Sequence, residues 1–199
     1  MFEYVNELEN KISNFFGSKF AVATDCCTHA LELCLRLKQI KKTSVPKHTY
    51  LSVPMTLEKL NISWNWVDNC WKDFYELEGT EIIDAAVLWR KNSYIPNTYM
   101  CLSFQFKKHL NLGRGGMILC DSESDYHSLK KMTYDGRDLT RPWAEQDIDM
   151  IGYHYYMTPE TAVIGLEKFN TAINTESKEW SYLDYPDLSK LKIFQSKNR

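Results

Sequence analysis

Short runs of apolar residues recur along the first 120 residues of the chain, and segments with helical spacing of apolar residues separate several of them. This alternation restricts the fold more than any other feature, because strands and helices that alternate along a chain build a sheet with helices on its faces. The strand-like runs are residues 20–24, 44–46, 62–68, 81–86, 99–104 and 116–120, and the helix-like segments are residues 2–16, 28–37, 50–60, 123–132 and 159–173. We therefore predict an α/β fold.

Composition excludes some classes of partner. The chain has 199 residues and is 44% hydrophobic, so it can bury a sizeable core. Its 24 basic and 26 acidic residues give a formal net charge of -2, and no basic run is longer than a pair of lysines. Because a phosphate backbone is bound by a concentrated basic surface, we expect no nucleic-acid partner.

The N-terminal segment and the cysteines indicate a cellular location. The first residues include acids and read as an amphipathic helix, and no apolar run is long enough to span a membrane. The six cysteines form no CxxC pair, and several lie in apolar runs, where a free thiol behaves as a small hydrophobe. We expect a soluble, cytoplasmic protein with no membrane partner, no disulfide framework and no metal site.

Polar residues follow several predicted strands, at the edge where open α/β sheets bind ligands. The turn after residues 20–24 could hold a phosphate through its amides and Thr28, although a threonine there can also simply cap the helix. Asp84 ends a strand, where it is either a contact to a bound group or an ordinary turn residue. Lys108 follows the strand that ends near Ser103; such a lysine is a nucleophile when desolvated and a solvated charge when exposed.

Five segments, taken in order, carry a more specific signal. They are FAVATDCCTHALELCL, VPKHTYLSVPMTL, EIIDAA, SFQFKKHLNLGRGGMIL and IGYHYYMTPETAVIGLEKF. In order and spacing they resemble motifs of the DegT/DnrJ/StrS family of pyridoxal-phosphate enzymes, chiefly sugar aminotransferases with the aspartate-aminotransferase fold. The resemblance implies a type I pyridoxal-phosphate transferase large domain at residues 1–173, with a mostly parallel central sheet and helices on both faces. A C-terminal extension at residues 174–199 would then stand where most of the family's small C-terminal domain is missing.

The resemblance also implies roles for individual residues. Lys108 falls on the position of the family's Schiff-base lysine, with Lys107 at the preceding threonine. Asp84 would pair with the pyridinium nitrogen of pyridoxal 5'-phosphate and keep it protonated, and Tyr50 would stack on the ring. The residues that would surround the phosphate are Cys27, Thr28, Ser103 and, from the neighbouring subunit of a homodimer with shared active sites, His154.

The function implied by the resemblance is transfer of an amino group from an amino acid such as glutamate to a keto sugar linked to a nucleotide, through a Lys108 Schiff base. The chain departs from the motifs at several positions: Cys27 replaces a glycine, Val87 a glutamine or histidine, Arg114 a glutamate and Tyr156 an arginine. Arg114 is either an anion contact or an exposed loop residue. The departures leave two alternatives open: a pyridoxal-phosphate enzyme of another reaction type, and a degenerate homologue that acts as a binding or dimer-partner subunit.

Overall fold

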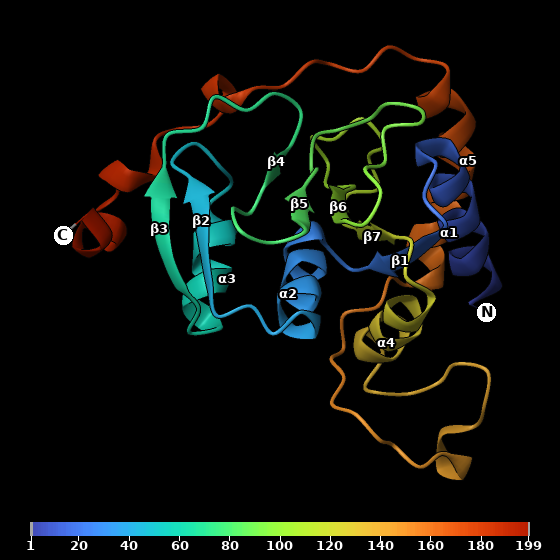
Figure 1. Cartoon of the computed structure of the whole chain (residues 1–199). Helices are drawn as coiled ribbons and strands as arrows, with labels where there is room; N and C mark the ends of the chain where they lie inside the picture. The colour runs from blue at the N-terminus through green and yellow to red at the C-terminus, as the bar shows by residue number, and fades with distance from the viewer. Residues whose placement is uncertain (1, 199) are drawn as a thin grey trace.

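The protein is described from a computed structural model of residues 2–198, in which helices and strands alternate as predicted (Figure 1). No helix within these residues has the length and apolarity that crossing a membrane requires. The helices are α1 (Glu3–Phe16), α2 (Cys27–Leu37), α3 (Ser52–Lys59), α4 (Glu123–Thr133) and α5 (Pro159–Ile173). The strands are β1 (Phe20–Thr24), β2 (Lys42–Pro46), β3 (Ser63–Val67), β4 (Tyr75–Glu76), β5 (Ile82–Asp84), β6 (Tyr99–Ser103) and β7 (Gly116–Cys120).

Local sequence signals account for where these helices begin and end. α1 stops at Gly17, whose φ of 85° is the left-handed conformation that glycine adopts without strain. α5 begins after Thr158, whose side chain accepts a hydrogen bond from the amide of Thr161, with Pro159 in the first turn. These signals are readable in the sequence, so both ends agree with the predicted positions.

The strands form two sheets. The five-stranded sheet has the order β1-β7-β6-β5-β4, and β2 pairs with β3 in a separate two-stranded sheet. Because β7 is antiparallel to both β1 and β6, and β5 is parallel to β6, the strands β1, β5 and β6 all run in one direction.

The prediction of a mostly parallel central sheet therefore agrees with the common direction of β1, β5 and β6. It does not agree with the pairing, because most neighbouring strands of the described sheet are antiparallel. Among residues 2–198, the parallel pairs are β5–β6 and β2–β3, and the remaining pairs are antiparallel. The reason is that parallel neighbours need a crossover connection, whereas β7 follows β6 through an irregular loop with no helix.

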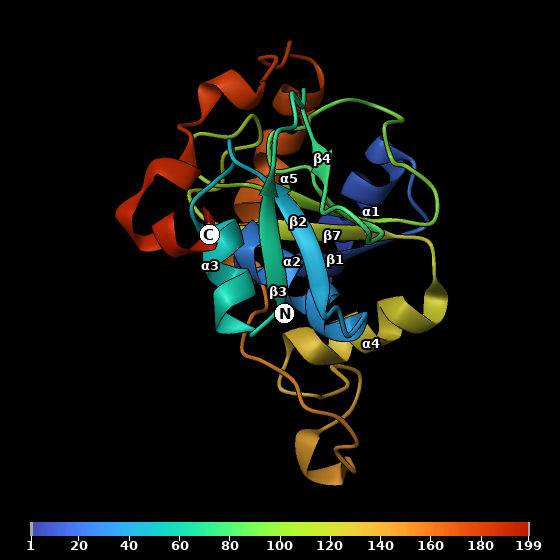
Figure 2. The same cartoon turned by 60° about the vertical axis from the view of Figure 1, so that its left-hand side comes forward.

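Helices cover both faces of the five-stranded sheet, as predicted (Figures 1 and 2). β7 shows the division, because its side chains alternate between two buried clusters. Met117 and Leu119 belong to the cluster that includes α1 and α5, whereas Ile118 and Cys120 belong to the one that includes α2 and α4. Burial on both faces explains why this strand reads as a continuous apolar run.

The segment after α5 has no regular helical period in the sequence, and it folds as a strap of short turns. It contains η2 (Tyr182–Asp184), η3 (Leu188–Lys190) and η4 (Lys192–Asn198). Figure 1 shows it leaving α5 and crossing the top of the molecule to end beside β3. The predicted boundary between residues 1–173 and 174–199 stays a prediction, and its outer ends, Met1 and Arg199, lie outside the described residues.

Candidate active site

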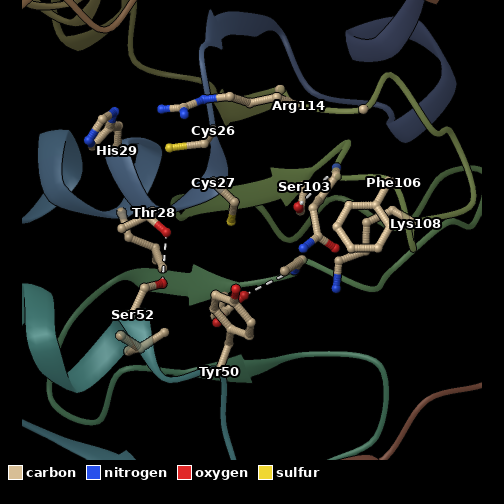
Figure 3. A pocket seen from close by; sticks show the side chains of 17 residues that line it. Cys26, Cys27, Thr28, His29, Tyr50, Ser52, Ser103, Phe106, Lys108 and Arg114 are labelled. Atoms are coloured by element: carbon tan, nitrogen blue, oxygen red, sulfur yellow. Dashed lines mark hydrogen bonds between the residues drawn. The ribbon is translucent and has the colours of Figure 1, made fainter.

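A cavity of about 450 Å³ lies where the last residues of β5 and β6 meet the first turn of α2 (Figure 3). Most of the residues predicted from the sequence line it. They are Lys108, Asp84, Tyr50, Cys27, Thr28 and Ser103. The cavity thus gathers residues from four separate parts of the chain into one site.

The start of α2 reaches the cavity because β7 packs closely against the turn before it. A Cβ atom on Gly116 would lie only 2.4 Å from the carbonyl carbon of Cys26 and 2.5 Å from the nitrogen of Cys27. Only glycine fits at this crossing.

Thr28 does not cap α2, so the alternative interpretation of this residue as an N-cap is wrong. The N-cap position belongs to Cys26, whose backbone is extended, and Thr28 lies within the first turn. Its hydroxyl is 2.7 Å from the hydroxyl of Ser52, across the cavity wall (Figure 3). Two hydroxyl groups and the free amides of a helix N-terminus therefore face the same space.

Asp84 is a buried acid held by two hydrogen bonds. The Tyr75 hydroxyl donates to its Oδ2 at 2.6 Å, and the Ala86 amide donates to its Oδ1 at 3.0 Å. Burial raises the pKa of Asp84 above its ordinary value, while these two donors and the positive charge of Lys108 oppose the rise. Thr49 hydrogen-bonds to the Tyr75 hydroxyl from the other side, so the carboxyl group ends a fixed polar chain.

Lys108 is half-buried in the cavity wall. Burial lowers the pKa of its amine, because an ammonium loses hydration there, and the nearby Asp84 and Cys27 oppose the fall. Its Nζ lies 3.5 Å from the hydroxyl of Tyr185 and 5.4 Å from the ring centroid of Trp180. An amine with a lowered pKa spends more time in the neutral, nucleophilic form.

The opposite rim of the cavity carries positive charge. Arg114 donates to Oδ2 of Asp25 at 2.7 Å, and Nδ1 of His29 lies 2.6 Å from Oδ1 of the same carboxylate. Burial lowers the pKa of His29, but its hydrogen bonds with Asp25 and Cys26 prevail and raise that pKa to about 9. Two cations thus surround one carboxylate, which leaves a net positive rim.

Arg114 is both an exposed loop residue and a contact to an anionic group. Its side chain is 69% exposed, yet it lines the cavity and is paired with a carboxylate (Figure 3). Asp25, Cys26 and His29 also bring three metal-ligand groups within 4.8 Å of one another. Both oxygens of Asp25 are, however, occupied by the two cations.

His154 is a predicted site residue that the fold does not bring into the cavity of its own chain. Its side chain is 70% exposed and its Nδ1 lies 2.9 Å from Asp135, in the segment before α5. The resemblance assigns it instead to the phosphate site of a neighbouring subunit, and this stays a prediction.

Sequence reasoning missed the residues that hold Asp84 and Lys108. Tyr75 lies on a two-residue strand in an irregular stretch, and Trp180 and Tyr185 lie in the strap after α5. The density of aromatic residues in the strap was the one signal available, because aromatic side chains in a polar segment often mark contact with a core.

The donor set fits pyridoxal 5'-phosphate. An amine at Lys108 suits its aldehyde, the carboxylate of Asp84 suits a protonated ring nitrogen, and the hydroxyl- and amide-lined end suits its phosphate. The lowered pKa of Lys108 and the cationic rim agree with the same orientation.

Comparison with solved structures identifies the fold. AtS13 from Actinomadura melliaura superposes with a TM-score of 0.72 at 19% identity, over 85% of this chain and 60% of that one. A sugar aminotransferase from Streptococcus pneumoniae in its PLP form gives a TM-score of 0.72 at 18% identity, over 85% and 59%. DesI, solved with its TDP-sugar product, gives 0.69 at 16%, over 85% and 53%. The fold is that of the pyridoxal-phosphate transferases.

The family follows from sequence. The chain belongs to the DegT/DnrJ/EryC1/StrS aminotransferase family, whose profile matches residues 1–76 and 96–186. No curated protein is detectably similar in sequence. The unmatched residues 77–95 include Asp84, so its assignment rests on the geometry of the cavity. The chain spans about 60% of the length of the solved relatives AtS13 and the pneumococcal enzyme.

Proposed function

We propose that the chain is a pyridoxal-phosphate-dependent aminotransferase that moves an amino group from an amino acid such as glutamate to a keto sugar carried on a nucleotide. The observation that carries the proposal is one cavity that holds the half-buried amine of Lys108, the buried carboxyl group of Asp84 and a cationic, hydroxyl-lined end. Family membership supports the reaction class, and the sugar product bound by DesI supports the substrate class.

Each group has a defined task. The bound cofactor supplies an aldehyde for amine exchange and a ring that accepts the electron pair released at the neighbouring carbon. Asp84, fixed from behind by Tyr75, would hold the proton on the ring nitrogen. Lys108 would take a proton from the substrate carbon and return it, since its pKa is lowered toward the working pH. The amides of α2 and the hydroxyls of Thr28 and Ser103 would bind the phosphate.

The test is to locate the lysine that binds the cofactor. Purified wild-type protein, Lys108→Ala and Lys107→Ala are mixed with pyridoxal phosphate, scanned for a visible absorbance band, reduced with borohydride and mapped by peptide mass. Lys107 is a matched control because it is adjacent in sequence but exposed. We expect the band and the trapped mass in wild type and Lys107→Ala, and neither in Lys108→Ala.

The outcomes separate the alternatives. An equal band in all three proteins, or none in wild type, would overturn the assignment of Lys108 and favour a binding homologue. If the cofactor is trapped on Lys108, amino donors are added and the loss of the band is followed. Loss with glutamate-like donors supports the aminotransferase, whereas a band that no donor discharges favours the dimer-partner alternative.

We also propose that the enzyme is a homodimer with shared sites. His154 is exposed, lies outside its own cavity and precedes α5, which makes it available to another subunit. The particle mass in solution tests the dimer. Mixing Lys108→Ala with His154→Ala subunits tests the sharing, because only a mixed dimer with shared sites regains one complete site.

A further inference from the structure

The strap after α5 contacts Lys108, one of the residues that line the cavity. The hydroxyl of Tyr185 is 3.5 Å from Nζ of Lys108, and the ring of Trp180 is 5.4 Å from the same atom. Residues on either side of η2 therefore approach the one amine that the proposed reaction uses. Charged and titratable groups on β5 and α2, namely Asp84 and Cys27, also act on this amine.

Backbone hydrogen bonds fix the strap in this position. The amide of Asp73 donates to the carbonyl of Trp180 at 2.8 Å, and the amide of Tyr182 donates to the carbonyl of Trp71 at 3.1 Å. Farther along, the amide of Leu188 donates to the carbonyl of Lys47 at 2.9 Å. Three anchors on both sides of Tyr185 hold it by the main chain.

The side chain and carbonyl of Tyr185 are also engaged. Nδ1 of His48 lies 2.8 Å from the carbonyl oxygen of Tyr185. The centroid of the Tyr185 ring lies 5.5 Å from that of the Trp71 ring. With backbone and ring both fixed, the hydroxyl group has little freedom except rotation of its proton. Its closeness to Lys108 is therefore a consequence of packing.

The chemistry of this contact suits an amine whose orientation is fixed, because the Tyr185 hydroxyl can hydrogen-bond to it in either protonation state. Burial, followed by the negative charge of Asp84, raises the pKa of Tyr185, so the hydroxyl stays neutral. A neutral hydroxyl accepts a hydrogen bond from an ammonium and donates one to a neutral amine. The other titratable groups that act on the lysine are Asp84 on β5, Cys27 on α2 and Lys107 beside it.

We infer that Tyr185 is a positioning residue for Lys108, which orients the amine toward the cavity, and that residues 180–188 of the strap cover the side of the lysine that faces away from the cavity. Its use in catalysis rests on the proposed function, but the orientation of the amine does not. Tyr185 also lines a small adjoining cavity together with Tyr50 and Asp84, so the strap fills space beside the lysine.

The test compares Tyr185→Phe with Tyr182→Phe and wild type. Tyr182 is a matched control, because it is a tyrosine in the same strap whose hydroxyl contacts Cys70 and not Lys108. Reductive methylation of Lys108 by formaldehyde and borohydride, followed by peptide mass across a pH series, reports the amine without any cofactor. Melting curves show whether each variant is folded.

Tyr185→Phe removes an acceptor for the ammonium, so the pH midpoint of methylation should move to lower pH. The limiting rate at high pH, where the amine is neutral in both proteins, should fall by roughly threefold, the effect of one weak hydrogen bond. Attachment of pyridoxal phosphate should slow similarly in Tyr185→Phe alone.

A midpoint and limiting rate equal to those of wild type and Tyr182→Phe would overturn the inference, even if Lys108 binds the cofactor. Conversely, a shifted midpoint in a protein that attaches no cofactor would support the contact while the proposed function fails. The two failures are therefore distinguishable.

Discussion

Replacing Tyr75 by Phe removes a hydroxyl that lies between Asp84 and Thr49. Two hydrogen bonds disappear, and both partners are buried, with Asp84 at 6% and Thr49 at 1% exposure. A hydrogen bond to a charged group contributes about 1.5–3 kcal/mol, and the hydroxyl left without its partner adds about 1 kcal/mol. We expect a loss of about 3 kcal/mol in the free energy of unfolding. For a chain of this length that is a fall in Tm of about 9 °C.

The pH dependence of this loss is a further check. The folded-state pKa of Asp84 lies above its ordinary value of 3.8. Ionisation of the buried carboxyl group therefore lowers the free energy of unfolding as the pH rises above that ordinary value. The cost is complete once the pH passes the folded-state pKa. Because Tyr75→Phe removes the strongest stabiliser of the carboxylate, it raises that pKa further. The difference between variant and wild type should be smallest in acid and grow as the pH rises.

The assay is urea unfolding of a double-mutant cycle with Tyr75→Phe and Asp84→Asn. Tyr94→Phe is the control for the loss of a tyrosine hydroxyl, because that hydroxyl donates to the carbonyl of Thr98 at 2.9 Å and interacts with Asp121 and not with Asp84; its loss should cost about 1 kcal/mol. We expect a coupling energy of at least about 1 kcal/mol between positions 75 and 84. Additive single mutations, or a cost no greater than that of Tyr94→Phe, would refute the fixed polar chain behind Asp84.

Two other substitutions test the opposite side of the cavity. Gly116→Ala should destabilise the protein and weaken cofactor binding, because its new methyl group overlaps the backbone before α2; melting curves and the visible band measure both. Asp25→Asn should lower the pKa of His29 from about 9 toward its ordinary 6.5, which an NMR titration of the ring measures. Since His29 has a raised folded-state pKa, its stabilising effect is complete below pH 6.5 and is lost as the pH rises through about 9; Asp25→Asn should reduce that pH dependence, with the contribution of Cys26 remaining. A pH dependence unchanged in Asp25→Asn would contradict the pairing.

The sequence predicted the elements of the fold better than their arrangement. The apolar run at residues 116–120 and the helix at 159–173 form at their predicted bounds, because burial on two faces or one stripe leaves a clear period. The direction of β7 leaves no such period, because pairing depends on the path of the connecting loop. The two-residue strand at Tyr75 is too short to produce any pattern.

The candidate site divides in the same way. Lys108, Asp84 and Thr28 follow strands or begin a helix, so their positions are readable from local pattern and resemblance. Arg114 meets Asp25 across 89 positions, and Tyr185 meets Lys108 across 77. Contacts between distant, unpatterned residues arise only when the whole chain has packed, and no local rule indicates them.

Asp84 and Lys108 differ in how far along the chain each lies from the tyrosine that contacts it. Tyr75 and Asp84 are 9 positions apart on neighbouring strands, whereas Lys108 and Tyr185 are 77 apart. Closing the longer loop costs about 2 kcal/mol more in chain entropy. When the unfolded chain folds, we therefore expect the acid half of the site to form early from a local hairpin, and the contact between the strap and the lysine to form later. The surroundings of the nucleophile, and not those of the acid, should then complete the site.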